Sequence, residues 1–79
     1  MTLIEALSIR VNELLKEREI TQYKLYSLSG VSQSTISDIR HQNNKKVTLN
    51  IIYEIAQGFN MDLPTFFDCP LFKNGNITD

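Results

Sequence analysis

The sequence predicts an all-α fold, a compact bundle of five short helices. Apolar residues recur at helical spacing in successive segments, and no part of the chain shows the alternation of a β-strand. A threonine, serine or aspartate stands before each of these segments, where a helix N-cap belongs. Because 79 residues suit one small domain, the helices must share one core. We expect the bundle to occupy residues 1–68, with a short tail at 69–79.

The first helix begins after Thr2, because Thr2 and Glu5 have the spacing of a capping box. Its inward face is the helically spaced set Leu7, Val11, Leu14 and Leu15. Glu19 lies at its expected end. Glycine or asparagine adopts the left-handed conformation of that position more easily, and a strained backbone there costs about 1 kcal/mol.

Two amphipathic segments flank Gly30. Thr21 caps a helix over 22–28, and Ser32 caps another over 33–40. Their predicted core residues are Leu25 and Leu28 in the first segment, and Ile36 and Ile39 in the second. Glycine takes the positive φ that ends one helix and turns the chain. This is the spacing of a helix-turn-helix, whose second helix can enter the DNA major groove.

Two more helices follow a polar, basic loop at 41–47. Thr48 caps the fourth, whose inner face is Ile51 or Ile52, Ile55, Ala56 and Phe59. Asp62 begins a short fifth helix, which Phe66 and Phe67 close. The tail that starts at Cys69 is expected to fray.

The charges are unevenly distributed although the net charge is only −1. Residues 22–46 carry four basic and one acidic side chain, whereas residues 47–79 carry one basic and four acidic. The positive part coincides with the helix-turn-helix and its following loop, as phosphate binding requires. The single Cys69 cannot form an internal disulfide, and His41 has no metal-binding partner. With no signal peptide or apolar span in view, we expect a cytoplasmic protein that needs no cofactor, metal, membrane or small-molecule substrate.

The order and lengths of these helices resemble the Cro/cI-like (XRE) helix-turn-helix family of phage and bacterial regulators, over residues 7–67. The matching positions are Arg10, Thr21, Gln22, Leu25, Gly30, Val31, Ser32, Ile36, Ile39, Thr48, Leu49, Ile55, Ala56 and 63–67. The resemblance implies a bundle of the lambda-repressor-like DNA-binding type. It also implies sequence-specific binding to double-stranded DNA, usually as a two-fold dimer. We therefore expect a transcriptional regulator, a repressor, that reads the major groove with its third helix.

Three places depart from the family pattern. Tyr26 stands where the family keeps an alanine between the second and third helices, so its ring must either splay them or point outward. Arg40 replaces a glutamate that pairs with the arginine at the position of Arg10, which leaves Arg10 to bind Glu54 or helix-end carbonyls. The glycine usual soon afterwards is absent from residues 41–44.

The outer face of the third helix is the predicted base-reading surface. Its candidates are Gln33, Ser34, Ser37 and Asp38. Gln33 offers a donor beside an acceptor, which matches adenine N6 and N7, and Asp38 can accept from cytosine N4. The alternative is that all four are ordinary solvated side chains.

Six further residues are candidate phosphate contacts: Gln22, Thr35, Asn43, Asn44, Lys45 and Lys46. The resemblance implies the role of Gln22, and a helix N-terminus suits an anion. For Gln22 the alternative is a cap-like role within the protein. For Thr35 it is a capping role, and for the loop residues it is plain solvation.

The expected partner besides DNA is a second copy of the chain. The predicted dimer contact is Phe66, Leu71 and Phe72, although all three could instead seal the core of a monomer, and Phe66 also has the helical spacing of a core residue. The competing function is a protein-binding, antitoxin-like or adaptor module of the same fold. An enzyme is not expected, because the sequence shows no nucleophile–base pair, metal cluster or phosphate-binding glycine loop.

Overall fold

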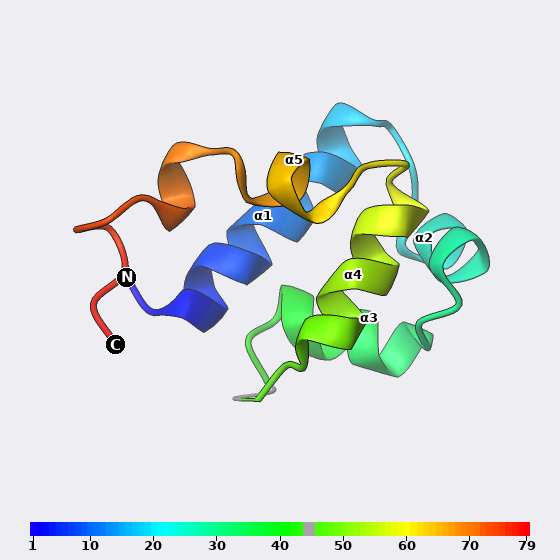
Figure 1. The fold of residues 1–79 in the computed structure, drawn as a ribbon. Helices are drawn as coiled ribbons and strands as arrows, with labels where there is room; N and C mark the ends of the chain where they lie inside the picture. The colour runs from blue at the N-terminus through cyan, green and yellow to red at the C-terminus, as the bar shows by residue number, and fades with distance from the viewer. Residues whose placement is uncertain (44–45) are drawn as a thin grey trace.

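The computed structural model describes residues 1–43 and 46–79, and every regular element in these residues is helical (Figure 1). The elements are α1 (Leu3–Glu17), α2 (Gln22–Ser29), α3 (Gln33–Arg40), α4 (Leu49–Gly58), α5 (Leu63–Phe67) and the 3₁₀ turn η1 (Pro70–Phe72). The predicted all-α bundle is confirmed. Its Cα radius of gyration is 11.6 Å.

All five α-helices begin after the polar residue predicted to cap them. In each case the cap side chain accepts a hydrogen bond from the backbone N–H three residues later; the caps are Thr2, Thr21, Ser32, Thr48 and Asp62. Thr2 and Glu5 form the full capping box. The predicted left-handed positions are also present, at Glu19 with φ of 55° and at Gly30 with φ of 77°.

The core contains the predicted inward faces with one exception. Its buried apolar residues are Ala6, Leu7, Val11, Leu14, Leu15, Leu25, Val31, Ile36, Ile39, Ile52, Ile55, Ala56, Phe59 and Phe66. The prediction for Leu28 is wrong, because this side chain is 53% exposed. The short α2 buries only a narrow strip against its neighbours, with Leu25 at the centre, and Leu28 lies to one side of that strip.

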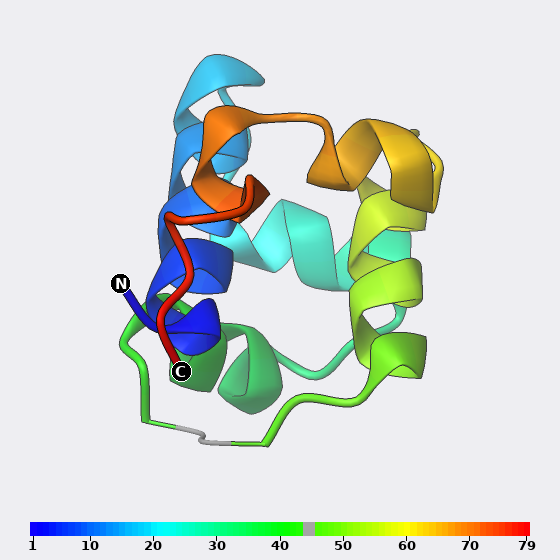
Figure 2. The ribbon, with the colours of Figure 1, turned by 60° about the vertical axis from the view of Figure 1, so that its left-hand side comes forward.

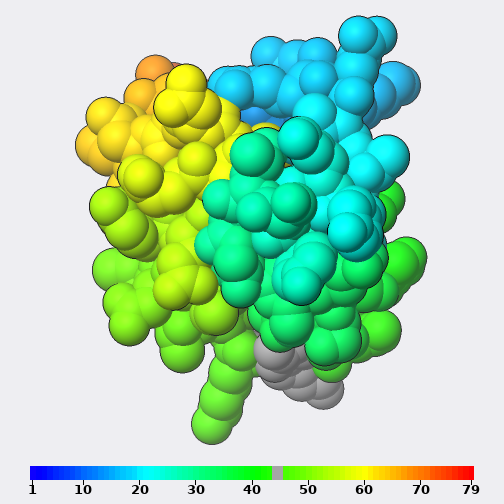
Figure 3. Space-filling model, turned by 90° about the vertical axis from the view of Figure 1, so that its right-hand side faces the viewer, coloured from blue at the N-terminus to red at the C-terminus, as the bar shows by residue number. Residues whose placement is uncertain are grey.

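Helices α2 and α4 lie side by side on one face of the molecule (Figure 3). Their approach is close at Gly58, where an added Cβ would lie 2.8 Å from the Cβ of Ser29 and 2.9 Å from Cδ1 of Leu25. Tyr26 takes the outward alternative. Its ring is 40% exposed and makes an edge contact with Tyr23 at 5.7 Å between centroids.

The tail packs back on the start of the chain, so the expectation that it frays is wrong. The two termini lie together in both ribbon views (Figures 1 and 2). The backbone N–H of Thr78 donates to the carbonyl oxygen of Met1 at 2.9 Å, and that of Leu3 donates to Oδ1 of Asp79 at 2.9 Å. These hydrogen bonds join α1 to the C-terminal end.

The phenylalanines of α5 and η1 form one cluster. Phe72 packs against Phe67 and Phe66, with ring centroids 5.0 and 6.3 Å apart. Phe72 therefore folds back on the core, which was one of its two alternatives. Phe66 is fully buried, so its predicted place in a dimer contact is wrong.

Among the described residues, no helix is long and apolar enough to cross a membrane.

Candidate nucleic-acid interface

Helix α3 presents a polar surface opposite a buried one. Ile36 and Ile39 anchor it in the core, and the Ser32 hydroxyl accepts from the N–H of Thr35 to hold its first turn. Gln33 and Ser34 are exposed in that first turn. Both side chains are therefore exposed on a helix that is anchored in the core, although the Ser34 hydroxyl lies 3.2 Å from that of Ser32.

The second turn of α3 is less free. Ser37 and Asp38 are half-buried. The Ser37 hydroxyl lies 3.3 Å from Nδ1 of His41, and the same nitrogen lies 2.8 Å from the Ser37 carbonyl oxygen. The carbonyl of Asp38 accepts from the N–H of Asn43, which closes the loop onto the helix end. The structure therefore brings Gln33 and Ser34 to the open end of α3 and sets Ser37 and Asp38 further back.

Gln22 is the first residue of α2, and its side chain binds two residues of α3. Its Nε2 donates to the carbonyl oxygen of Gln33 at 3.3 Å, and its Oε1 accepts from Nη1 of Arg40 at 3.0 Å. These hydrogen bonds support the alternative expected for Gln22, a cap-like role within the protein. An amide nitrogen carries two hydrogens, so a donor is still left for another acceptor.

Arg40 ties α3 to α1 as well as to α2. Its Nε donates to Oδ1 of Asn12 at 2.6 Å, and its carbonyl oxygen accepts from the Ser8 hydroxyl at 2.7 Å. Asn12, not Arg10, is the α1 residue that binds the Arg40 guanidinium. Sequence reasoning missed Asn12 entirely, because an asparagine on a helix face carries no signal of its partner.

Arg10 binds helix-end carbonyls, one of the two alternatives expected for it, and not Glu54. Its Nε and Nη2 donate to the carbonyl oxygens of Phe66 and Thr65 at 2.7 and 3.1 Å. The guanidinium also lies 5.7 Å from the centroid of the Phe66 ring. Cations favour the C-terminal end of a helix dipole, so Arg10 serves as a cap for α5.

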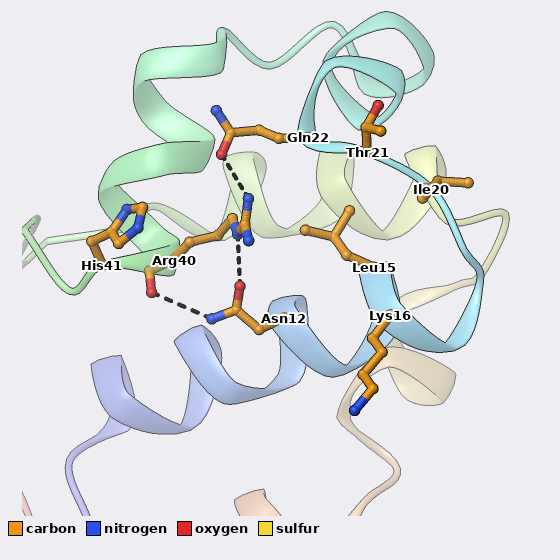
Figure 4. Close-up of a pocket in the computed structure, with 8 residues that line it drawn as sticks. All are labelled: Asn12, Leu15, Lys16, Ile20, Thr21, Gln22, Arg40 and His41. Atoms are coloured by element: carbon orange, nitrogen blue, oxygen red, sulfur yellow. Dashed lines mark hydrogen bonds between the residues drawn. The ribbon is translucent and has the colours of Figure 1, made fainter.

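A cleft of about 640 Å³ opens where α1, α2 and α3 meet. It is lined by Asn12, Leu15, Lys16, Ile20, Thr21, Gln22, Arg40 and His41 (Figure 4). None of these lining residues is acidic, within the part of the chain that the structure describes. The cleft joins the N-terminal end of α2 to a fixed guanidinium, and both attract anions.

The remaining phosphate candidates divide into three groups. Thr35 is half-buried and its hydroxyl accepts from that of Ser32 at 2.9 Å, which gives the capping alternative a structural basis. Asn43, which follows the end of α3, and Lys46, which precedes α4, are exposed. Asn44 and Lys45 lie outside the described residues. No group of three or more potential metal ligands gathers in the described ranges 1–43 and 46–79.

Comparison with known proteins finds two matches. Residues 10–70 match the family described as the Cro/C1-type HTH DNA-binding domain. Among solved structures, a point mutant of the restriction-modification controller protein C.Esp1396I superposes with a TM-score of 0.78 at 22% sequence identity, covering 85% of this chain and 86% of that one. At this identity the likeness speaks for the fold. No match was found among curated proteins.

Proposed function

Because the chain belongs to the Cro/C1-type helix-turn-helix DNA-binding family, we propose that it is a transcriptional repressor that binds double-stranded DNA as a homodimer and reads the major groove with α3. The observation that carries the proposal is the first turn of α3. Gln33 and Ser34 are exposed there on a helix held by a capped N-terminus and two buried isoleucines. A rigid helix with free polar side chains is what base recognition needs.

Within this proposal the residues divide by role. Base edges are contacted by Gln33 and Ser34 in the first turn, and by Ser37 and Asp38 behind them. Phosphates are contacted by Gln22, Thr35 and the loop side chains Asn43, Asn44, Lys45 and Lys46. Phosphate contacts set the register of the protein on DNA, whereas base contacts give it a preferred sequence.

The homodimer follows from the small size of the recognition surface. One such helix reads only a few base pairs, and a two-fold pair doubles the specificity that many competing sites demand. The half-sites then lie about 34 Å apart, one turn of the duplex. With Phe66 buried and Phe72 in the aromatic cluster, Leu71 is the member of the predicted dimer contact that is still open to a partner.

The test is selection of binding sites from random duplex DNA, followed by affinity measurements on point variants. We expect a near-palindromic consensus, and repression of a reporter when that site overlaps its promoter. Gln33→Ala is expected to cost about 1–3 kcal/mol on the selected site and to relax the preference at one base position per half-site. Gln57→Ala, an exposed glutamine on α4, is the matched control and keeps both affinity and preference.

Three outcomes would contradict parts of this proposal. Uniform weakening of Gln33→Ala on all sequences would place Gln33 on the DNA backbone. A footprint on one asymmetric site would exclude the two-fold dimer. Failure to enrich any sequence would favour the protein-binding alternative.

A further inference from the structure

The cleft between α1, α2 and α3 is bounded by Arg40 and His41 at the C-terminal end of α3, and by Gln22 at the N-terminal end of α2. Gln22 lines the cleft and its Nε2 donates to the carbonyl oxygen of Gln33, the first residue of α3. A group bound in the cleft is therefore adjacent to Gln22, which the proposed function places on the DNA backbone. On a DNA strand, that adjacent group is a backbone phosphate.

The charges of the cleft suit such an anion. Lys16 and Arg40 carry positive charge into its lining, and the lining contains no carboxylate among the described residues. The N-terminal end of α2 contributes the positive end of its dipole and its first backbone amides. Arg40 and the N-terminal end of α2 thus offer two attractions for one negative group, whereas the Lys16 side chain points away from both (Figure 4).

Arg40 is the side chain best prepared for this role. Its guanidinium lies between Asn12 and Gln22, held by Nε at 2.6 Å from Asn12 Oδ1 and by Nη1 at 3.0 Å from Gln22 Oε1 (Figure 4). A guanidinium has five donors, and within the described residues Nη2 of Arg40 has no hydrogen bond. Because the side chain is already ordered, little rotamer entropy is lost when a ligand binds.

The same hydrogen bonds orient Gln22. Arg40 occupies Oε1 of Gln22, so the amide points its Nε2 donor toward Gln33, on the side away from the Arg40 guanidinium (Figure 4). An unrestrained amide could rotate and present its oxygen, which repels a phosphate. Arg40 therefore supplies a charge and also fixes the orientation of the neighbouring Gln22 amide.

We propose that Arg40 is a phosphate-binding residue of the DNA interface, and that the cleft receives one backbone phosphate at Nη2 of Arg40. This rests on the proposed DNA-binding function. It differs from a purely structural role, in which Arg40 only ties α3 to its two neighbours. The two roles predict different salt dependences.

The test compares wild-type protein with Arg40→Gln and Asn12→Ala on a random-sequence duplex, by fluorescence anisotropy at several salt concentrations. Arg40→Gln removes the charge but leaves a side chain that can hydrogen bond. Asn12→Ala removes the same link to α1 and keeps the charge. We expect Arg40→Gln to weaken binding about tenfold at low salt and to reduce the slope of log K against log salt by about 0.9. Between 50 and 200 mM salt this slope change corresponds to a factor of about 3.5.

The Asn12→Ala control decides between the phosphate-binding role and the structural role of Arg40. Asn12→Ala is expected to retain the wild-type slope because it keeps the charge of Arg40, although it loses thermal stability and the part of the affinity that the ordering of Arg40 supplies. Equal slopes for all three proteins would overturn the proposal while leaving DNA binding intact. Absence of duplex binding by the wild type would overturn the proposed function itself.

If Arg40→Gln does not fold, NMR on the wild-type protein answers the question. On titration with the random-sequence duplex, the side-chain signals of Arg40 and Gln22 are expected to shift together at the earliest additions. The side-chain signals of Arg10, which is hydrogen bonded to α5, are the internal control and are expected not to shift. An unshifted Arg40 signal in a protein that binds the duplex would refute the assignment.

Discussion

Substitution of Gly58 by alanine tests the close approach of α2 and α4. Gly58 is the last residue of α4 and is buried. A Cβ there would lie 2.8 Å from the Cβ of Ser29 and 2.9 Å from Cδ1 of the buried Leu25. Both distances are far below a carbon–carbon contact of about 3.5–4.0 Å, so the two helices would have to separate.

The size of the effect follows from two opposing terms. Overpacking a tight contact costs about 1–3 kcal/mol. Alanine is favoured over glycine inside a helix by up to about 1 kcal/mol, and by less in a final turn. We expect Gly58→Ala to lower the free energy of unfolding by about 1–2 kcal/mol. For a domain of this size the melting temperature then falls by about 5–15 °C.

Thermal and urea unfolding followed by circular dichroism measure this change. Gln57→Ala is the neighbouring control, exposed on the same helix and expected to stay within about 0.5 kcal/mol of wild type. Ser29→Gly in the Gly58→Ala background removes the 2.8 Å contact. It is expected to recover part of the loss, as a coupling of at least about 0.5 kcal/mol in a double-mutant cycle. An unfolding temperature for Gly58→Ala at or above the wild-type value would refute the reasoning.

Three further changes test other contacts. Phe72→Ala removes a ring whose centroid lies 5.0 Å from that of Phe67, and it is expected to lower the free energy of unfolding in urea by about 2 kcal/mol. A changed oligomeric state without lost stability would favour the dimer contact instead. Arg10→Met removes two hydrogen bonds to α5 carbonyls and should destabilise by about 1–3 kcal/mol in urea unfolding, so unchanged stability would contradict the cap. Hydrogen bonds from Thr65, first from its hydroxyl and second from its backbone N–H, hold the pKa of Asp62 below the ordinary value of 3.8. The ionised carboxylate therefore stabilises the folded state above pH 3.8, and this stabilisation is lost as the pH falls through the lowered pKa. Melting between pH 7 and 2 should show a smaller acid-induced fall for Asp62→Asn than for wild type, and equal falls would refute the assignment.

Local features of the sequence determine where the helices begin and which way most of them face. A cap such as Ser32 and the amide it accepts from are three residues apart, so both are readable in one short window. The positive φ of Gly30 is equally local. Helical periodicity selects the inward residues of α1, α3 and α4 for the same reason, because each helix is long enough or regular enough to define one apolar face.

The candidate site is predictable only in part. The exposure of Gln33 and Ser34 follows from the period of α3, since Ile36 and Ile39 fix its inner face. The hydrogen bonds of Gln22 do not follow from it, because they depend on where Arg40 arrives from a different helix.

The tertiary structure alone decides which elements share each contact. Leu28 has the spacing of a core residue, yet α2 is packed through a narrower strip and leaves it exposed. Arg40 meets Asn12 across 28 positions of sequence, and Arg10 meets Phe66 across 56. Which residues become partners depends on how several helices pack around one small core, and therefore on the packing surfaces of all of them together. A cap needs only the next turn of its own helix, whereas these contacts need the assembled fold.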